Sequence, residues 1–228
     1  MSQQPNNLTS RDKIFAALAN ASGPMTQDAQ AIQNEAQALL AASEFARPQA
    51  VSSDATEALI MRVNKGLVIG TTCERINTLS ELPASVLSFL NTHKLAPSLN
   101  VQKTGVFNQL DWGSIEITVD IKNDNTVGLC LAEYGVAETG SFVVHSGPNL
   151  PVLLNFLPLY LMAVIPKSKI LPYMDDYAAI ANDIASKGET PRNMCLISGV
   201  SGTTDIEGVL VQGAHGPEFL HLIIVDDM

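Results

Sequence analysis

The chain has 228 residues, of which 46% are apolar, and a formal net charge of −10 from 13 Lys and Arg against 23 Asp and Glu. This length and apolar fraction are enough for one sizeable core and predict an ordinary globular protein. The negative charge disfavours nucleic acid and anionic membranes as partners, because both would repel the chain at long range.

The N-terminal residues Met1–Ser10 are polar and lack the basic patch and apolar stretch of a secretory signal, so we expect a cytoplasmic protein. The most apolar window, Leu150–Ile165, is interrupted by Pro151, Asn155 and Pro158. It is also shorter than the roughly 20 residues that a membrane-spanning helix needs. We therefore interpret this window as core.

The three cysteines, Cys73, Cys130 and Cys195, are odd in number and far apart in the sequence. Neither a disulfide framework nor a cysteine-only metal or iron–sulfur site can be drawn from them. We expect reduced, buried thiols and no metal or cofactor site in this chain.

Two helices are predicted at the N-terminus. The first begins with Ser10 as the candidate N-cap and has apolar residues at helical spacing. The second, Gln27–Ala46, has no internal Gly or Pro and ends before Pro48. We predict that residues 1–50 form a helical cap and residues 51–228 the main domain.

Strands then alternate with helices, the latter at Leu82–Thr92 and Pro172–Ser186. Continuous apolar strands in such an order predict an α/β fold, with three α/β/α layers and a mostly parallel sheet covered on both faces. The predicted strands are Gly66–Gly70, Ser114–Asp120, Thr126–Ala132, Ser141–His145, Tyr160–Ile165, Met194–Ser198 and Leu220–Val225.

The loop after Met194–Ser198 is rich in Gly and hydroxyl residues, which indicates a site at strand ends. Its backbone N–H groups could face one anion. Alternatively, Thr204 caps a helical turn and Glu207, three residues on, completes a capping box. The candidate ligand-binding residues of this loop are Ser201, Gly202, Thr203, Thr204, Asp205 and Glu207.

Two further residues are candidates for catalysis. His215 lies between small residues in a turn, where it could shuttle a proton, bind an anion or simply bind a backbone carbonyl. Glu138 lies in a loop where Gly140 allows close approach of a ligand, and it could be a base, a nucleophile or a capping group. A hydrolase triad of Ser201, Asp205 and His215 is disfavoured, because no nucleophile-elbow motif is present.

Several segments together resemble the LUD-domain family, the C-type subunits of bacterial lactate utilisation. The resemblance is strong after about Thr126 and loose between Ala50 and Asn125. The segments that carry it are Ser198–Glu207, Gly213–Pro217, Leu220–Val225, Val136–Val144, Phe156–Pro158 and Arg11–Phe15.

The resemblance implies a fold like that of glucosamine-6-phosphate deaminase, ribose-5-phosphate isomerase and the CoA transferases. It also implies an accessory role in oxidising L-lactate to pyruvate, with iron–sulfur oxidoreductase subunits as partners that carry the clusters. A homo-oligomer is left open. The alternatives are a small-molecule enzyme of the isomerase and CoA-transferase type, with Glu138 reacting, or a module that binds a small organic anion.

This chain departs from the family pattern at several positions. Val200 stands where the family usually has proline, and Gly202 where it has arginine. Apolar residues around Val152 and Leu161 replace an arginine and a histidine. The chain therefore resembles a divergent member with part of the usual anion-binding charge missing.

Overall fold

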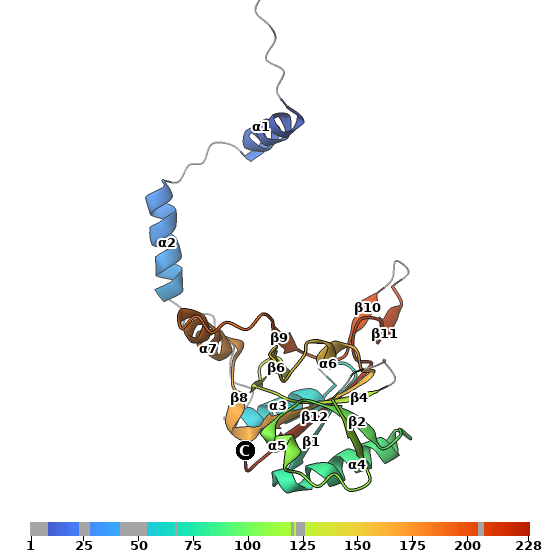
Figure 1. Ribbon diagram of the computed structural model, residues 1–228. Coiled ribbons are helices and arrows are strands. Elements are labelled where there is room, and N and C mark those ends of the chain that lie inside the picture. The colour runs from blue at the N-terminus through green and yellow to red at the C-terminus, as the bar shows by residue number, and fades with distance from the viewer. Residues whose placement is uncertain are drawn as a thin grey trace, which may run out of the picture. The chain divides into compact units, whose positions relative to one another are not determined.

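The computed structural model describes residues 9–22, 28–41, 54–66, 68–119, 121, 126–204 and 208–228 (Figure 1). The chain divides into two compact units, Met1–Pro48 and Gln49–Met228, which are described separately. The predicted domain boundary, between residues 50 and 51, lies outside the described residues.

The first unit contains α1 (Ser10–Ser22) and α2 (Ala29–Ala41). At the start of α1, Asp12 N donates to Thr9 Oγ1 at 3.3 Å, and Thr9 N donates to Asp12 Oδ2 at 3.1 Å. This reciprocal pair is a capping box, so the capping residue is Thr9 and not the predicted Ser10. Every described side chain of both helices is exposed.

The second unit is built on a six-stranded sheet with the order β1-β12-β7-β4-β2-β3, in which every neighbouring pair is parallel. The central strands β4, β7 and β12 are buried almost throughout. Strands covered on both faces need apolar residues at successive positions, which explains their continuous apolar runs. The strands are β1 (Thr71–Ile76), β2 (Ser98–Val101), β3 (Glu116–Thr118), β4 (Val127–Leu131), β7 (Tyr160–Pro166) and β12 (Phe219–Val225).

A second, four-stranded sheet has the order β8-β5-β6-β9. It consists of β5 (Tyr134–Val136), β6 (Ser141–His145), β8 (Ile170–Leu171) and β9 (Met194–Ile197). In this sheet β6 is antiparallel to both β5 and β9, whereas β5 and β8 are parallel.

A separate antiparallel hairpin is formed by β10 (Gly202–Thr204) and β11 (Leu210–Gln212). All its strand residues are exposed. Figure 1 shows the hairpin standing away from both sheets.

Helices cover one face of the six-stranded sheet, where Leu82, Val86 and Leu90 of α4 and Phe107 of α5 pack against sheet residues such as Met162. All of these side chains are at most 1% exposed. The helices of this unit are α3 (Ala55–Asn64), α4 (Leu82–Thr92), α5 (Gly105–Asn108), α6 (Leu153–Phe156) and α7 (Met174–Ser186), with short 3-10 turns at η2 (Leu79–Glu81) and η3 (Lys167–Lys169).

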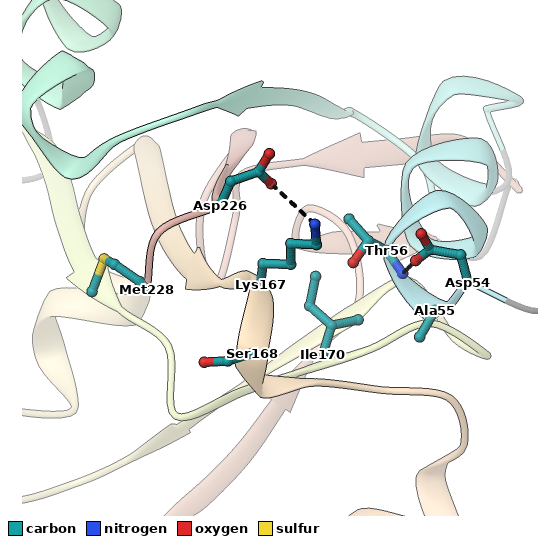
Figure 2. A pocket seen from close by; sticks show the side chains of 8 residues that line it. All are labelled: Asp54, Ala55, Thr56, Lys167, Ser168, Ile170, Asp226 and Met228. Carbon is teal, nitrogen blue, oxygen red and sulfur yellow. Dashed lines mark hydrogen bonds and ion pairs between the residues drawn. The ribbon is translucent and has the colours of Figure 1, made fainter.

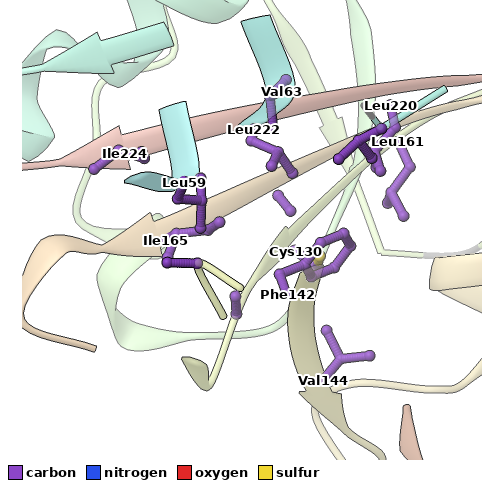
Figure 3. Packing of buried hydrophobic residues seen from close by; sticks show 14 of the residues in the cluster. Leu59, Val63, Cys130, Phe142, Val144, Leu161, Ile165, Leu220, Leu222 and Ile224 are labelled. Atoms are coloured by element: carbon purple, nitrogen blue, oxygen red, sulfur yellow. The ribbon is translucent and has the colours of Figure 1, made fainter. Parts of the chain in front are cut away.

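The opposite face carries α3, α6 and the second sheet. Leu59 of α3 and Phe142 of β6 belong to one buried cluster with Cys130, Ile165 and Leu222 of the large sheet (Figure 3). This cluster joins the two sheets into one core, so the second face is covered by strands as well as helices.

The predicted α/β fold with a mostly parallel sheet is confirmed, and the predicted helix Leu82–Thr92 matches α4 at both ends. The predicted strand Gly66–Gly70 is wrong. Gly66 and Gly70 have φ of +70° and +62°, which places them in turns, and the strand begins at Thr71. The predicted strand at Met194 forms, but in the second sheet rather than the parallel one.

Candidate functional site

A pocket of about 570 Å³ opens at the carboxyl ends of β7 and β12, beside the first turn of α3 (Figure 2). The carboxyl ends of parallel strands are where open α/β sheets usually bind ligands. The pocket is lined by Asp54, Ala55, Thr56, Lys167, Ser168, Ile170, Asp226 and Met228.

Ion pairs connect the charged residues at this end of the sheet. Arg75 Nε lies 2.7 Å from Asp226 Oδ1, and Arg75 Nη1 lies 2.8 Å from Glu57 Oε1. Lys167 Nζ lies 3.9 Å from the same Asp226 oxygen. The hydrogen bond from Arg75 lowers the pKa of Asp226. Each of these side chains is at least a quarter exposed, so the pairs contribute little to stability individually and mainly fix the geometry.

Asp54 closes the pocket on the α3 side as the N-cap of that helix. Its Oδ1 accepts hydrogen bonds from Thr56 N at 2.8 Å and Glu57 N at 3.4 Å, and these bonds lower the pKa of Asp54. The pocket therefore presents two carboxylates, one ammonium group and two hydroxyl groups. Such a lining suits a small polar molecule that carries both signs of charge.

None of the residues predicted from the sequence lines this pocket. Glu138 instead lies at the start of α7, where its Oε2 accepts a hydrogen bond from Met174 N at 2.8 Å. Of the three roles left open for this carboxylate, the observed geometry is that of a capping group.

Gly140 lies in a close contact between the second sheet and the segment before β1. It has a φ of +67°, and a Cβ at this position would lie 2.5 Å from Val68 Cγ2 and 3.3 Å from Arg62 Cδ. The Ser198 hydroxyl donates to the neighbouring Thr139 carbonyl at 3.0 Å. The structure thus brings two of the predicted segments together. Arg62 Nε, beside them, is buried without a hydrogen-bond partner among the described residues.

The predicted anion loop lies near the amino ends of β1 and β12. Ser201 N donates to Pro217 O at 2.8 Å, and Ser201 O accepts from Gly213 N at 2.9 Å. The Ser201 amide therefore binds backbone and is not directed at a ligand. Thr204 belongs to β10, and the residues that would complete the alternative capping box, up to Glu207, lie outside the described residues.

The other candidate residues near that loop lie in different elements. Gly202 and Thr203 are exposed strand residues of the hairpin, and His215 is exposed in the turn before β12. Asp205 and Glu207 lie outside the described residues.

His221 of β12 was not among the predicted site residues, yet its side chain is only 10% exposed and both ring nitrogens are engaged. His221 Nδ1 lies 2.7 Å from Thr72 Oγ1, and His221 Nε2 lies 3.1 Å from Glu74 Oε1. The same Glu74 oxygen accepts a hydrogen bond from the Ser85 hydroxyl. The His221 ring stacks on Phe89, with centroids 4.8 Å apart. A hydroxyl, an imidazole and a carboxylate in series can relay a proton.

The alternation of side chains between the two faces of β1 could have revealed this network. Thr72 and Glu74 are two residues apart and lie on the same face, and Thr72 pairs directly with His221 across the parallel ladder. The signal was missed because the sequence interpretation placed the strand before Thr71.

The thiols have raised pKa values. Burial raises the pKa of Cys73 and of Cys130 to about 12, and burial also raises that of Cys195. All three are free thiols; Cys130 is buried, whereas Cys73 and Cys195 are only partly buried. Their protonated form is favoured at neutral pH, which makes them poor nucleophiles.

Within the described part of the chain, no group of three or more His, Cys, Asp or Glu side chains is placed to hold a metal ion. No helix in the described ranges is long and apolar enough to cross a membrane.

The family model of the LUD domain matches residues 25–225 of this chain. The chain is 38% identical over 102 residues to Lactate utilization protein C of Halalkalibacterium halodurans, an alignment that covers 44% of each chain. It is 35% identical over 102 residues to the protein of the same name from Bacillus subtilis, covering 44% of this chain and 42% of that protein. The matched part is thus less than half the length of these relatives.

A solved structure has the same fold. The crystal structure of a DUF162 family protein from Deinococcus radiodurans superimposes with a TM-score of 0.55 and 17% sequence identity, covering 76% of this chain and 99% of that one. At this identity the likeness shows the fold alone.

Proposed function

Because the chain belongs to the LUD domain family, we propose that it takes part in lactate utilisation, as an accessory subunit in the oxidation of L-lactate to pyruvate. The observation that carries this proposal is the 38% identity over 102 residues with a relative named Lactate utilization protein C. Because the alignment covers 44% of that relative, the role of the relative is assigned to this chain only as a proposal.

The proposal includes partner proteins that carry iron–sulfur clusters. Oxidation of lactate to pyruvate removes two electrons and two protons, and iron–sulfur clusters accept electrons one at a time. The family resemblance supports such partners. This chain would then act in a complex with them rather than as a free-standing dehydrogenase.

Growth on lactate tests the proposal. Deletion of the gene in its native host should impair growth on L-lactate as sole carbon source, while growth on glucose stays normal. A plasmid copy of the full chain should restore growth. Normal growth of the deletion strain on L-lactate would contradict the proposed role.

A biochemical assay tests the accessory character. The purified chain alone should show no lactate-dependent reduction of an artificial electron acceptor, whereas the complex isolated with its iron–sulfur partners should reduce it. Dye reduction by the isolated chain would contradict the accessory role and leave the link to lactate intact.

A further inference from the structure

Two neighbouring hollows flank the loop at Gly147–Leu150, away from the pocket in Figure 2. The larger has a volume of about 730 Å³ and the smaller about 70 Å³. Pro148 and Pro151 line both, so the hollows share one wall.

The charge of these hollows is opposite to that of the chain. Arg192 lines the larger one and Lys103 the smaller, and neither lining contains a carboxylate among the residues that the structure describes. Acidic residues outnumber basic ones by 23 to 13 in the whole chain. Within the described residues, neither cation has an ion-pair partner; the pairs found there join Arg75, Lys167, Lys187 and His221 to acids elsewhere.

The walls of the larger hollow are fixed before any ligand arrives. Ser146 N donates to Asn193 O at 2.9 Å, and Asn193 N donates back to Ser146 Oγ at 2.9 Å. Gly147 and Leu150 exchange backbone hydrogen bonds of 3.1 and 3.2 Å. Fixed walls lower the ordering cost of binding.

The remaining lining is largely apolar, and it includes Leu150, Val152 and Pro191. A guanidinium group prefers a carboxylate, with which it can form two parallel hydrogen bonds. We propose that the larger hollow binds a small organic carboxylate, with Arg192 pairing with the carboxylate group and the apolar wall receiving a short carbon chain. Lys103 adds a second positive charge from the neighbouring hollow.

The site differs from the predicted anion loop at Ser201–Thr204, and it does not depend on the proposed role in lactate utilisation. The site is supported by the cavity, the two cations and the lack of acids among the described lining residues. Lactate and pyruvate are two of many acids that would fit.

Titration calorimetry on the full chain, in a buffer without carboxylates, tests the site. The probes are L-lactate, pyruvate and 2-oxobutyrate, with lactamide as the uncharged analogue of lactate. We expect at least one acid to bind at millimolar concentration or below, and lactamide to bind at least tenfold more weakly than lactate if lactate binds.

Variants locate the binding. Arg192→Gln should weaken binding of the acid at least tenfold, and Lys103→Gln should weaken it less. Arg11→Gln in α1 removes the same charge elsewhere and should leave binding unchanged. Because Arg192 is exposed, its replacement should leave the melting temperature without ligand unchanged, which separates loss of binding from loss of folding.

Three results would overturn the site: no binding of any of the three acids, wild-type affinity in Arg192→Gln, or equal weakening by Arg192→Gln and Arg11→Gln. The growth test of the proposed function does not depend on any of these three binding results. Failure of the carboxylate site can therefore be distinguished from failure of the proposed role in lactate utilisation.

Discussion

Both nitrogens of the His221 ring are engaged, one by the Thr72 hydroxyl and the other by the Glu74 carboxylate. A nearly buried imidazole needs such partners, because an unpaired polar group in the interior costs free energy. The pKa of Glu74 is lowered, first by the hydrogen bond with His221 and then by that from Ser85, while partial burial opposes the shift. The network therefore links stability to pH.

Glu74→Gln should lower the free energy of unfolding near neutral pH by on the order of 1 kcal/mol, since the carboxylate is more than a third exposed and its interactions are screened. The folded-state pKa of Glu74 lies below its ordinary value of 4.5. The Glu74 carboxylate therefore stabilises the fold fully above pH 4.5. This stabilisation is lost as the pH falls through the folded-state pKa of Glu74. Urea unfolding from pH 7 to pH 3 should show the two proteins converging.

The control for this variant is Glu35→Gln, on the exposed surface of α2. It should unfold like the wild type at every pH. A stability gap between Glu74→Gln and the wild type that stays constant down to pH 3 would contradict the assignment to Glu74 ionisation.

Gly140 and Gly66 allow a comparison of backbone strain with steric clash. Both have positive φ, of +67° and +70°, but a Cβ on Gly140 would lie 2.5 Å from Val68 Cγ2, whereas a Cβ on Gly66 meets nothing within 4 Å. Alanine at either position should cost about 1 kcal/mol of strain. Gly140→Ala should cost a further ~1–3 kcal/mol for overpacking.

Denaturant unfolding of the two alanine variants measures that difference directly. Val68→Ala should remove part of the clash, so the double variant with Gly140→Ala should lose less than the sum of the two single losses. Equal destabilisation by Gly66→Ala and Gly140→Ala would mean that the close approach to Val68 does not govern Gly140.

Val200 shows how one substitution from the family pattern fits its surroundings. Its N–H donates to Ile69 O at 3.2 Å, and its methyl groups would lie within 2.8 Å of a Cβ on Gly70. Proline, which the resemblance implies for the family at this position, cannot donate this bond. The hydrogen bond gives Val200 a structural role between the loop and the start of β1.

Among the elements, α7 depends on a residue from another part of the chain. The first N–H groups of a helix have no partner inside it, and Glu138 supplies one for Met174 N. Glu138→Ala should destabilise the protein by about 1 kcal/mol, as loss of a helix cap does. Glu138→Gln should cost less, because the amide oxygen still accepts the bond. Thermal unfolding monitored by circular dichroism measures both.

The same two variants test the alternative in which Glu138 is a reacting carboxylate. Incubation with a panel of acyl-CoAs followed by mass spectrometry should show no adduct, because the side chain is engaged at the start of α7. A covalent acyl adduct that Glu138→Gln abolishes would contradict this and favour a transferase-like enzyme.

The sequence predicted correctly those elements whose pattern of apolar residues depends on burial alone. α4 and the central strands were found because their apolar residues follow the period of a helix or form a continuous run. β1 was missed because its residues Thr-Thr-Cys-Glu-Arg-Ile are mostly polar, and the apolar run before it is bounded by glycines in turns. The hairpin was missed because its short strands are exposed.

At the scale of the whole molecule, every buried cluster formed by the described residues belongs to the second unit. The buried side chains of the described residues lie between Thr56 and Val225. A chain beginning at Gln49 should therefore fold, with a melting temperature within about 3 °C of the full chain. Loss of a cooperative thermal transition in this shorter chain would contradict the independence of the second unit.

The sequence by itself determined the fold class, the family and most of the buried strands, because burial imposes a periodic apolar pattern that is visible locally. The structure does not bring the predicted site residues together. Glu138 precedes Thr139, whose carbonyl accepts a hydrogen bond from Ser198, whereas Ser201 and His215 lie near the amino ends of β1 and β12.

Only the tertiary structure decided which side chains meet. Thr72 contacts His221 across 149 positions because β12 lies beside β1 in the sheet, and Lys103 and Arg192 flank one loop although they come from distant segments. Strand order and loop packing follow from the sum of many weak contacts over the whole core, and no local pattern encodes that sum.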